Sequence, residues 1–357
     1  MKNGYQWDLG SRGLHKRQFW EHAGLVGALV AVSCLIGGLL VVLSACRSGA
    51  RQAQQFRDLS FDIAPTGDKI IFTGKGKGNW DLYFLDLTTK KVTLLAETDQ
   101  WERHPQFSPD GKFILYTAAD NPQDPHTAWH LFLRSVDGKT VQQLTSGSKV
   151  ADDWALFVPP HGERILFARC HALIQTAWRG YVWDWNNAEY LLIKRDGTEL
   201  RAAPFRWGDI FLHAFSPDGD KLLVSKPVDA NSQVHLPEML IMEINSSTFS
   251  INRTVTLGSG DTPIWSPDGT RIAFVADRKQ PYAYELWIMD ADGSNARQLT
   301  SLGAYITNPR FTPDGKSILF LVERDAAYEL WKVDVDGRHL ERIADKGLFE
   351  SPLQWKP

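Results

Sequence analysis

The sequence predicts an all-β fold, a six-bladed β-propeller of four-stranded antiparallel blades preceded by one N-terminal hydrophobic helix. The first observation is a Pro-x-Gly turn that recurs six times at intervals of 44 to 57 residues. The second is an apolar triplet that begins three residues after each of these glycines. The third is composition, because 14 Trp and 18 Phe occur with 28 Gly and 18 Pro, a mixture typical of many short strands joined by turns.

The N-terminal segment 1–46 is predicted to be a membrane leader. Residues 23–45 contain no charged side chain, and this length is sufficient for a helix to cross a bilayer. Positive charges precede the run at Lys2, Arg12, Lys16 and Arg17, which favours a cytoplasmic N-terminus and places the rest of the chain outside the cytoplasm.

The apolar run ends in Leu43-Ser44-Ala45-Cys46, which resembles the bacterial lipobox. The resemblance implies that Cys46 carries a lipid anchor, that 47–57 form a tether, and that 58–357 form the propeller. The alternative is an uncleaved signal anchor, because the run is longer than that of a typical signal peptide. Both alternatives predict a propeller tethered to a membrane of a bacterial cell envelope.

The repeated turn defines the units of the predicted propeller. Proline presets φ at the first corner, aspartate bonds the backbone two residues on, and glycine accepts positive φ. The apolar triplet after the turn is followed by a second apolar segment, such as ELWIMD (285–290), and by a short last strand, such as ARQLTS (296–301). The six turns are Pro65/Gly67, Pro109/Gly111, Pro160/Gly162, Pro217/Gly219, Pro267/Gly269 and Pro313/Gly315.

Each unit is therefore a four-stranded meander that cannot bury both faces alone, and a period of 40 to 50 residues is typical of a propeller blade. Residues 266–300 read SPDG, an apolar strand, LWIMDADG and QLT, which is similar to the WD40-like (PD40) repeats of TolB-type periplasmic propellers. Residues 312–344 and 108–145 follow the same phrase. The resemblance covers about 58–357 and implies the fold. It implies no role in the Tol-Pal system, because the small α/β domain that precedes the TolB propeller has no counterpart here.

The closure of the ring has two alternatives. The tail 351–357 aligns with a further first strand, 44 residues after Pro313, and would complete the first blade. The segment 59–63 would occupy that position otherwise.

A channel mouth on one face is the predicted binding site. Strand alternation puts the turns between the first and second strands on one face, here the turn face. The connections between blades lie on the other, the loop face. Segments entering each first strand carry aromatic and acidic residues, suited to a cationic peptide or a stacked sugar, although large side chains also cover blade ends. The candidates are Trp101, His104, Asp152, Asp153, Trp207, Asp209, Asp261, Tyr305 and Glu350.

A long loop of the third unit, roughly 168–189, is a second candidate for binding, since long loops with their own aromatics are often functional. Its candidate residues are Trp178, Tyr181, Trp183 and Trp185. The alternative is that the loop folds over its own blade as a flap.

Other chemistry is not indicated by the sequence, and no cofactor or metal is predicted. No Gly-x-Ser-x-Gly elbow occurs, and His126 and His130 lack the glutamate of a zinc peptidase. A formal charge of −3 disfavours nucleic acid as a partner. Cys170 is predicted to be a buried thiol.

We therefore expect a non-catalytic, membrane-tethered propeller outside the cytoplasm that binds a protein, peptide or glycan at the mouth. An alternative is a saccharide-active enzyme, a lyase or hydrolase, that uses the same mouth with His104 and His213 near the axis. A third hypothesis is a structural envelope component that binds through its outer blade edges.

Overall fold

A computed structural model describes residues 59–357, except 77, 96, 122–123, 125, 177–179, 207–209, 227–235, 278–283, 326, 351, 355 and 357. The predicted leader (1–46), with its lipobox at Cys46, and the tether (47–57) lie outside the described residues. Within the part of the chain that the structure describes, no helix has the length and apolar character needed to cross a membrane.

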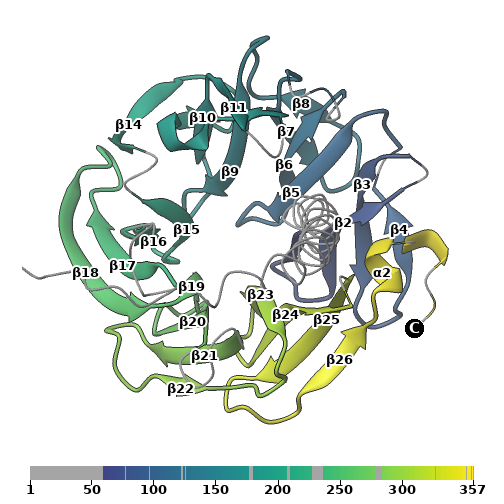
Figure 1. The fold of residues 1–357 in the computed structure, drawn as a ribbon, viewed down its shortest axis with the longest axis vertical. Coiled ribbons are helices and arrows are strands. Elements are labelled where there is room, and N and C mark those ends of the chain that lie inside the picture. Colours follow the sequence, from purple (N-terminus) through teal and green to yellow (C-terminus); the bar gives the residue numbers. More distant parts are fainter. Residues whose placement is uncertain are drawn as a thin grey trace, which may run out of the picture. The chain divides into compact units, whose positions relative to one another are not determined.

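The described chain forms six four-stranded antiparallel sheets arranged as the blades of a propeller (Figure 1). The first three blades cover 61–206. Blade 1 contains β1 (Phe61–Ile63), β2 (Lys69–Lys75), β3 (Trp80–Asp86) and β4 (Val92–Leu94); blade 2 contains β5 (Trp101–Phe107), β6 (Phe113–Ala119), β7 (His130–Ser135) and β8 (Val141–Gln143); blade 3 contains β9 (Ala151–Phe157), β10 (Arg164–Cys170), β13 (Glu189–Lys194) and β14 (Arg201–Arg206).

The last three blades cover 211–344 and repeat the same order. Blade 4 contains β15 (Phe211–Phe215), β16 (Lys221–Lys226), β17 (Glu238–Ile244) and β18 (Ile251–Ser259); blade 5 contains β19 (Asp261–Trp265), β20 (Arg271–Ala276), β21 (Glu285–Asp290) and β22 (Arg297–Gln298); blade 6 contains β23 (Tyr305–Phe311), β24 (Ser317–Arg324), β25 (Ala327–Asp334) and β26 (Glu341–Ala344). The predicted six four-stranded blades are confirmed, whereas the predicted N-terminal helix lies outside the described residues.

Blade 3 carries an insertion between its second and third strands. Between β10 and β13 the chain forms a hairpin, β11 (Leu173–Thr176) with β12 (Gly180–Trp183), and a short 3-10 helix, η1 (Trp185–Asn187). Its two strands form a separate sheet. The long loop seen in the sequence is therefore largely regular structure.

The Ser-Pro-Asp-Gly phrase is explained by hydrogen bonds within the turn. In blade 5 the amide of Gly269 donates to the carbonyl of Ser266 over 2.9 Å, and the Ser266 hydroxyl donates to Asp268 over 2.5 Å. The same hydroxyl accepts the amide of Arg271 at 2.9 Å. Gly269 has φ 69°, in the left-handed region that glycine adopts without steric cost.

The turns also contact one another around the ring, each glycine facing a proline of the preceding blade. A Cβ built on Gly111 would lie 3.6 Å from Pro65, and one built on Gly269 would lie 3.5 Å from Pro217. The contact that closes the circle joins blade 6 to blade 1, since a Cβ on Gly67 would lie 3.5 Å from Pro313. The recurrence of the turn thus follows from a ring of matching contacts.

The ring is closed without a shared blade. The short strand β1 pairs with β2, with Phe61 opposite Phe72, so blade 1 is complete in itself. The tail is not a strand but forms α2 (Gly347–Glu350) and η2 (Pro352–Gln354). Phe349 is 1% exposed and meets the ring of Phe72 edge-on at 5.6 Å between centroids. Apolar packing between blades 6 and 1 therefore completes the fold.

The core lies between the blades. The second strand of each sheet is almost completely buried, as in β20 and β24, and apolar clusters join neighbouring sheets. Cys170, at the end of β10, is 1% exposed, and burial raises the pKa of its thiol. The prediction of a buried thiol is confirmed.

Candidate channel-mouth site

The innermost strands carry a repeated irregularity that presents side chains near the channel. Five of them, β5, β9, β15, β19 and β23, shift register against the second strand. At four of these bulges one non-glycine residue has positive φ: His104 (52°), Trp154 (48°), Thr262 (46°) and Asn308 (51°). A bulge re-aims side chains, so these four form a set that we call the display positions.

Trp154 is the aromatic display position. It is 37% exposed and the one Trp among the exposed large hydrophobic residues of the described chain. Its indole meets Trp185 edge-on at 4.4 Å between ring centroids. The imidazole of His104 also stacks on the indole of Trp154, with 6.5 Å between the ring centroids and an interplanar angle of 25°. Residues of blades 2 and 3 and of the blade 3 insertion therefore meet in one aromatic cluster.

Asp153 lies beneath this cluster and is 1% exposed. Its carboxylate accepts from Nη2 of Arg103 and Nδ1 of His104, both at 2.7 Å, from the Thr117 hydroxyl at 3.3 Å and from the amide of Trp154 at 2.9 Å. Burial raises the pKa of Asp153, but the charges of Arg103 and His104 outweigh it and hold that pKa well below its usual value. One buried anion thus fixes two strands.

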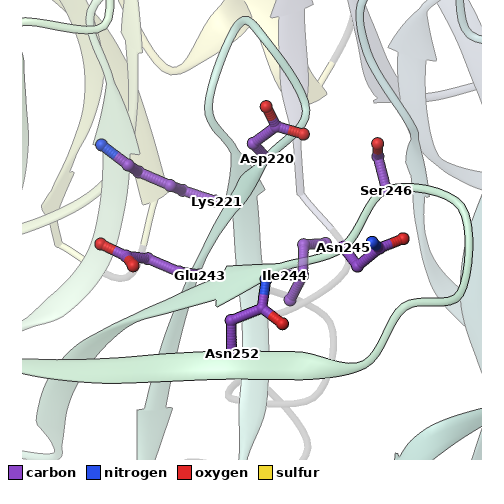
Figure 2. A pocket seen from close by; sticks show the side chains of 7 residues that line it. All are labelled: Asp220, Lys221, Glu243, Ile244, Asn245, Ser246 and Asn252. Carbon is purple, nitrogen blue, oxygen red and sulfur yellow. The ribbon is translucent and has the colours of Figure 1, made fainter.

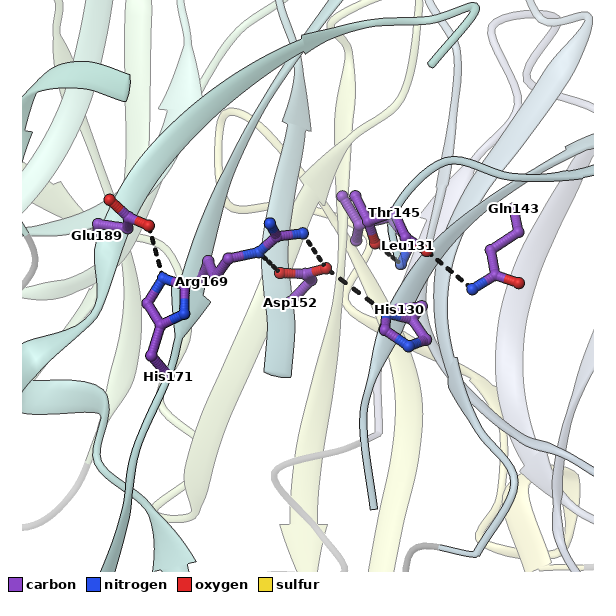
Figure 3. Close-up of polar contacts among 8 residues, drawn as sticks. All are labelled: His130, Leu131, Gln143, Thr145, Asp152, Arg169, His171 and Glu189. Atoms are coloured by element: carbon purple, nitrogen blue, oxygen red, sulfur yellow. Dashed lines mark hydrogen bonds and ion pairs between the residues drawn. The ribbon is translucent and has the colours of Figure 1, made fainter. Parts of the chain in front are cut away.

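Asp152 is the centre of a second buried network (Figure 3). It is fully buried and accepts from Nε and Nη2 of Arg169 at 2.6 and 2.9 Å, with Nδ1 of His130 at 3.8 Å. Burial raises the pKa of Asp152, whereas the hydrogen bonds and the charge of Arg169 lower it below the usual value. Figure 3 also shows the His171–Glu189 pair, which is joined at 2.6 Å, on the side of Arg169 away from Asp152.

These networks correct the prediction of a mouth with open carboxylates at Asp152 and Asp153. The two side chains are buried and each is matched by an arginine from a neighbouring strand, Arg169 and Arg103. Arg103 also lies 3.6 Å from the ring centroid of Trp129, which strengthens its placement. The two buried carboxylates therefore hold neighbouring strands in place through Arg103 and Arg169.

Polar side chains further along the inner strands join successive blades. The amide of Phe107 donates to Asp62 at 2.9 Å, and the amide of Phe157 donates to Gln106 at 3.1 Å. Nε of Arg310 lies 3.5 Å from Asp62. Burial raises the pKa of Asp62 and lowers that of Arg310 despite their attraction. This chain of contacts runs through blades 6, 1, 2 and 3.

His213 occupies the bulge of β15. Its Nε2 shares a hydrogen bond of 2.8 Å with the hydroxyl of Ser225. Burial lowers the pKa of His213 to about 4, with Asp261 opposing the shift and Arg310 adding to it. The imidazole is therefore neutral near pH 7. Asp261 accepts the amide of Thr262 at 2.7 Å, as Asp153 does for Trp154.

The other predicted site residues are placed as follows. Tyr305, at the start of β23, is 39% exposed and meets Tyr284 edge-on at 5.1 Å. Trp101 is partly buried and packs against the apolar core, as does Trp183. Glu350 ends α2, which lies on the outer side of the ring (Figure 1) and not at its centre. Outside the described residues lie Trp178, Trp207 and Asp209, together with the side chain of Tyr181.

Sequence reasoning missed Trp154, Arg103 and Arg310. The position of Trp154 was readable in principle, because it precedes the recurring aromatic residue Phe157 by three positions, as His104 precedes Phe107. The bulge that re-aims this position is not marked by any particular residue type in the sequence, so the sequence did not predict it. Across the described residues, no three or more His, Cys, Asp or Glu side chains gather as a metal site would require.

Two surface recesses lie away from the mouth. One, of about 400 Å³, opens on the turn face of blade 4, and Figure 2 shows its lining. The other, of about 460 Å³, lies on blade 6. The first is lined by Asp220, Lys221, Glu243, Ile244, Asn245, Ser246 and Asn252, and the second by Arg324, Glu329, Trp331 and Arg342.

The fold and the mouth define a closed six-bladed propeller that displays side chains from bulged inner strands. Residues 205–357 match the model of the TolB beta propeller domain (PD40). An uncharacterized protein of Agrobacterium fabrum is 30% identical over 241 residues, which cover 66% of this chain and 71% of that protein. The chain belongs to the TolB β-propeller family.

Two further comparisons delimit what this membership implies. An uncharacterized peptidase of Bacillus subtilis is 33% identical over 109 residues, which cover 30% of this chain and only 16% of the peptidase. The crystal structure of TolB from Acinetobacter baumannii superposes with a TM-score of 0.58 at 18% identity, over 78% of this chain and 64% of that chain. At this identity the likeness concerns the fold alone.

Proposed function

We propose that this protein is a non-catalytic binding propeller that holds a segment of a partner protein at the channel mouth, with Trp154 as the central anchor. The single observation that carries the proposal is a tryptophan at a display position, 37% exposed and braced by two other rings. Aromatic anchors of this kind supply most of the energy in protein interfaces.

The rigidity of the mouth supports a binding role. A non-glycine residue with positive φ costs about 1–3 kcal/mol, and Asp153 offsets this by accepting the amide of Trp154. The ring of Trp154 is thereby held in place before a partner arrives. Preorganised side chains lose little conformational entropy on binding, so affinity can be gained without movement.

The charge of the mouth supports a partner segment with apolar or aromatic side chains. Asp153 is matched by Arg103, and Asp62 by Arg310, so these carboxylates do not add a net negative field. Exposed apolar surface comes from the indole of Trp154, at the bulge in the middle of β9, and from the phenol ring of Tyr305, the first residue of β23.

We also propose that the propeller acts outside the cytoplasm, tethered to a bacterial membrane. The support is the uncharged run 23–45, the lipobox-like residues that end at Cys46, and the positive charges before the run. A tether of this kind would orient the propeller at the membrane surface and raise the effective concentration of an envelope partner.

Affinity capture with matched variants tests the binding role. The tagged full chain is purified from solubilised envelope beside Trp154→Ala, Tyr305→Ala and the control Leu340→Ala, which changes an exposed side chain in the blade 6 turn before β26. We expect one set of captured proteins to be retained with Leu340→Ala and lost with Trp154→Ala. Equal capture by all four forms would contradict a binding mouth.

A further inference from the structure

The recess of blade 6 lies away from the mouth and is built from strands of the outer half of the blade. Glu329 and Trp331 project from β25, Arg342 projects from β26, and Arg324 ends β24. Its volume of about 460 Å³ falls within the range of small-molecule sites, about 300–1,000 Å³. The channel-mouth cluster around Trp154 belongs to blades 2 and 3, so the two sites are separate.

Blade 5 provides an internal comparison because it repeats the same strand pattern. There Glu285, at the position of Glu329, is 6% exposed, accepts the Thr300 hydroxyl at 2.5 Å and accepts the amide of Gly303 at 2.7 Å. Gln298 lies opposite Trp287. The blade 5 carboxylate is therefore satisfied by uncharged partners inside the blade.

Blade 6 departs from this pattern at two positions. The threonine is replaced by Ala344, and Arg342 stands opposite Trp331. Glu329 instead accepts from Nη1 of Arg342 at 2.8 Å and from Nε1 of Trp331 at 3.0 Å. The indole of Trp331 is partly buried, and it lines the recess together with Arg342.

The recess carries an excess of positive charge. Arg324 lies 3.6 Å from Glu329 and places its guanidinium 5.9 Å from the ring centroid of Trp331. The side chains of Arg324 and Arg342 are 46% and 52% exposed. Among the described residues Glu329 is the one carboxylate paired with either guanidinium, so two cations share one anion.

We propose that the recess binds an acidic sugar unit, a hexuronate. Guanidinium groups bind carboxylates through paired, charge-assisted hydrogen bonds, and Arg324 and Arg342 would hold the sugar carboxylate. The partly buried ring of Trp331 offers an apolar surface to the C–H face of a pyranose ring. Glu329, held by hydrogen bonds from Arg342 and Trp331, would accept hydrogen bonds from the ring hydroxyls.

The test is a titration of the full chain with D-glucuronate followed by ligand-observed NMR, with D-glucose as the uncharged comparison. We expect saturable binding of glucuronate and at least tenfold weaker binding of glucose, because one charge-assisted hydrogen bond changes affinity by about tenfold or more. Absence of glucuronate binding, or equal binding of glucose, would overturn the proposal.

Two variants locate the binding. Arg342→Gln introduces the side-chain type that blade 5 carries at Gln298, and we expect it to weaken glucuronate binding about tenfold or more. Arg338→Gln makes the same charge change at the Asp336 turn of blade 6, where Arg338 is 77% exposed, and should leave binding unchanged. Equal affinities for the two variants would assign any binding to another surface and refute the site.

Discussion

Removal of the buried charge beneath the mouth, by Asp153→Asn, is expected to lower the free energy of unfolding by about 3 kcal/mol. Loss of one partner from a buried ion pair destabilises proteins by about 3–5 kcal/mol. We take the lower end because 15% of the Arg103 side chain is exposed. Asparagine keeps the shape of the side chain, so the measured change reports mainly the charge and its hydrogen bonds to Arg103 and His104.

The assay is urea unfolding of the propeller followed by circular dichroism, with Asp137→Asn as the control. Asp137 is 54% exposed and pairs with Lys139 at 3.0 Å, so its loss should change stability by less than about 1 kcal/mol. The pKa of Asp153 is lowered in the folded state. The stabilisation from its charge is therefore present above the unfolded-chain pKa of about 3.9 and lost as pH falls below it. Equal unfolding midpoints for the two variants at pH 7 would refute the assigned role of Asp153.

Two further predictions concern the turn ring and the channel. Gly219→Ala should destabilise the protein by about 3 kcal/mol or more, and Gly269→Ala by about 1–2 kcal/mol. Both glycines have positive φ, but of the two only a Cβ on Gly219 would overlap the carbonyl oxygen of Pro159. Similar melting curves for the two variants would contradict this prediction. His213→Gln should flatten the dependence of the unfolding free energy on pH between about 6.5 and 4. In that range the imidazole is protonated in the unfolded chain but still neutral in the folded protein, whose pKa at His213 is about 4, so the wild type should lose up to about 3 kcal/mol of stability. Parallel curves of stability against pH for the two proteins would count against a buried, neutral His213.

The sequence was sufficient for the fold because the turn chemistry is local. Ser266, Asp268 and Gly269 satisfy one another within six residues, so the pattern that fixes the turn is contiguous and readable. The apolar triplet after it fixes the buried second strand. The tail was not readable, because its course depends on the gap between blades 6 and 1 that Phe349 fills.

The site was less readable because it depends on contacts between distant residues. Asp153 is separated from Arg103 by 50 positions in the sequence, and without that partner it looks like an exposed acid of a strand start. The placement of Trp154 depends on a bulge, which interrupts the alternation that sequence reasoning uses. The special position of Arg342 becomes visible only when the strand pairing of blade 6 is compared with that of blade 5, where Gln298 lies opposite the tryptophan.

The most direct test of the central claim, that the mouth binds a partner protein, is site-specific photo-crosslinking in cells that produce the full chain. A photoreactive phenylalanine analogue replaces Trp154 or Tyr305 at the mouth, or the exposed Val141 or Leu340 on the outer half of a blade. We predict that both mouth positions give an adduct with the same protein and that the outer positions do not. Adducts from the outer positions alone, or from none of the four, would contradict the claim.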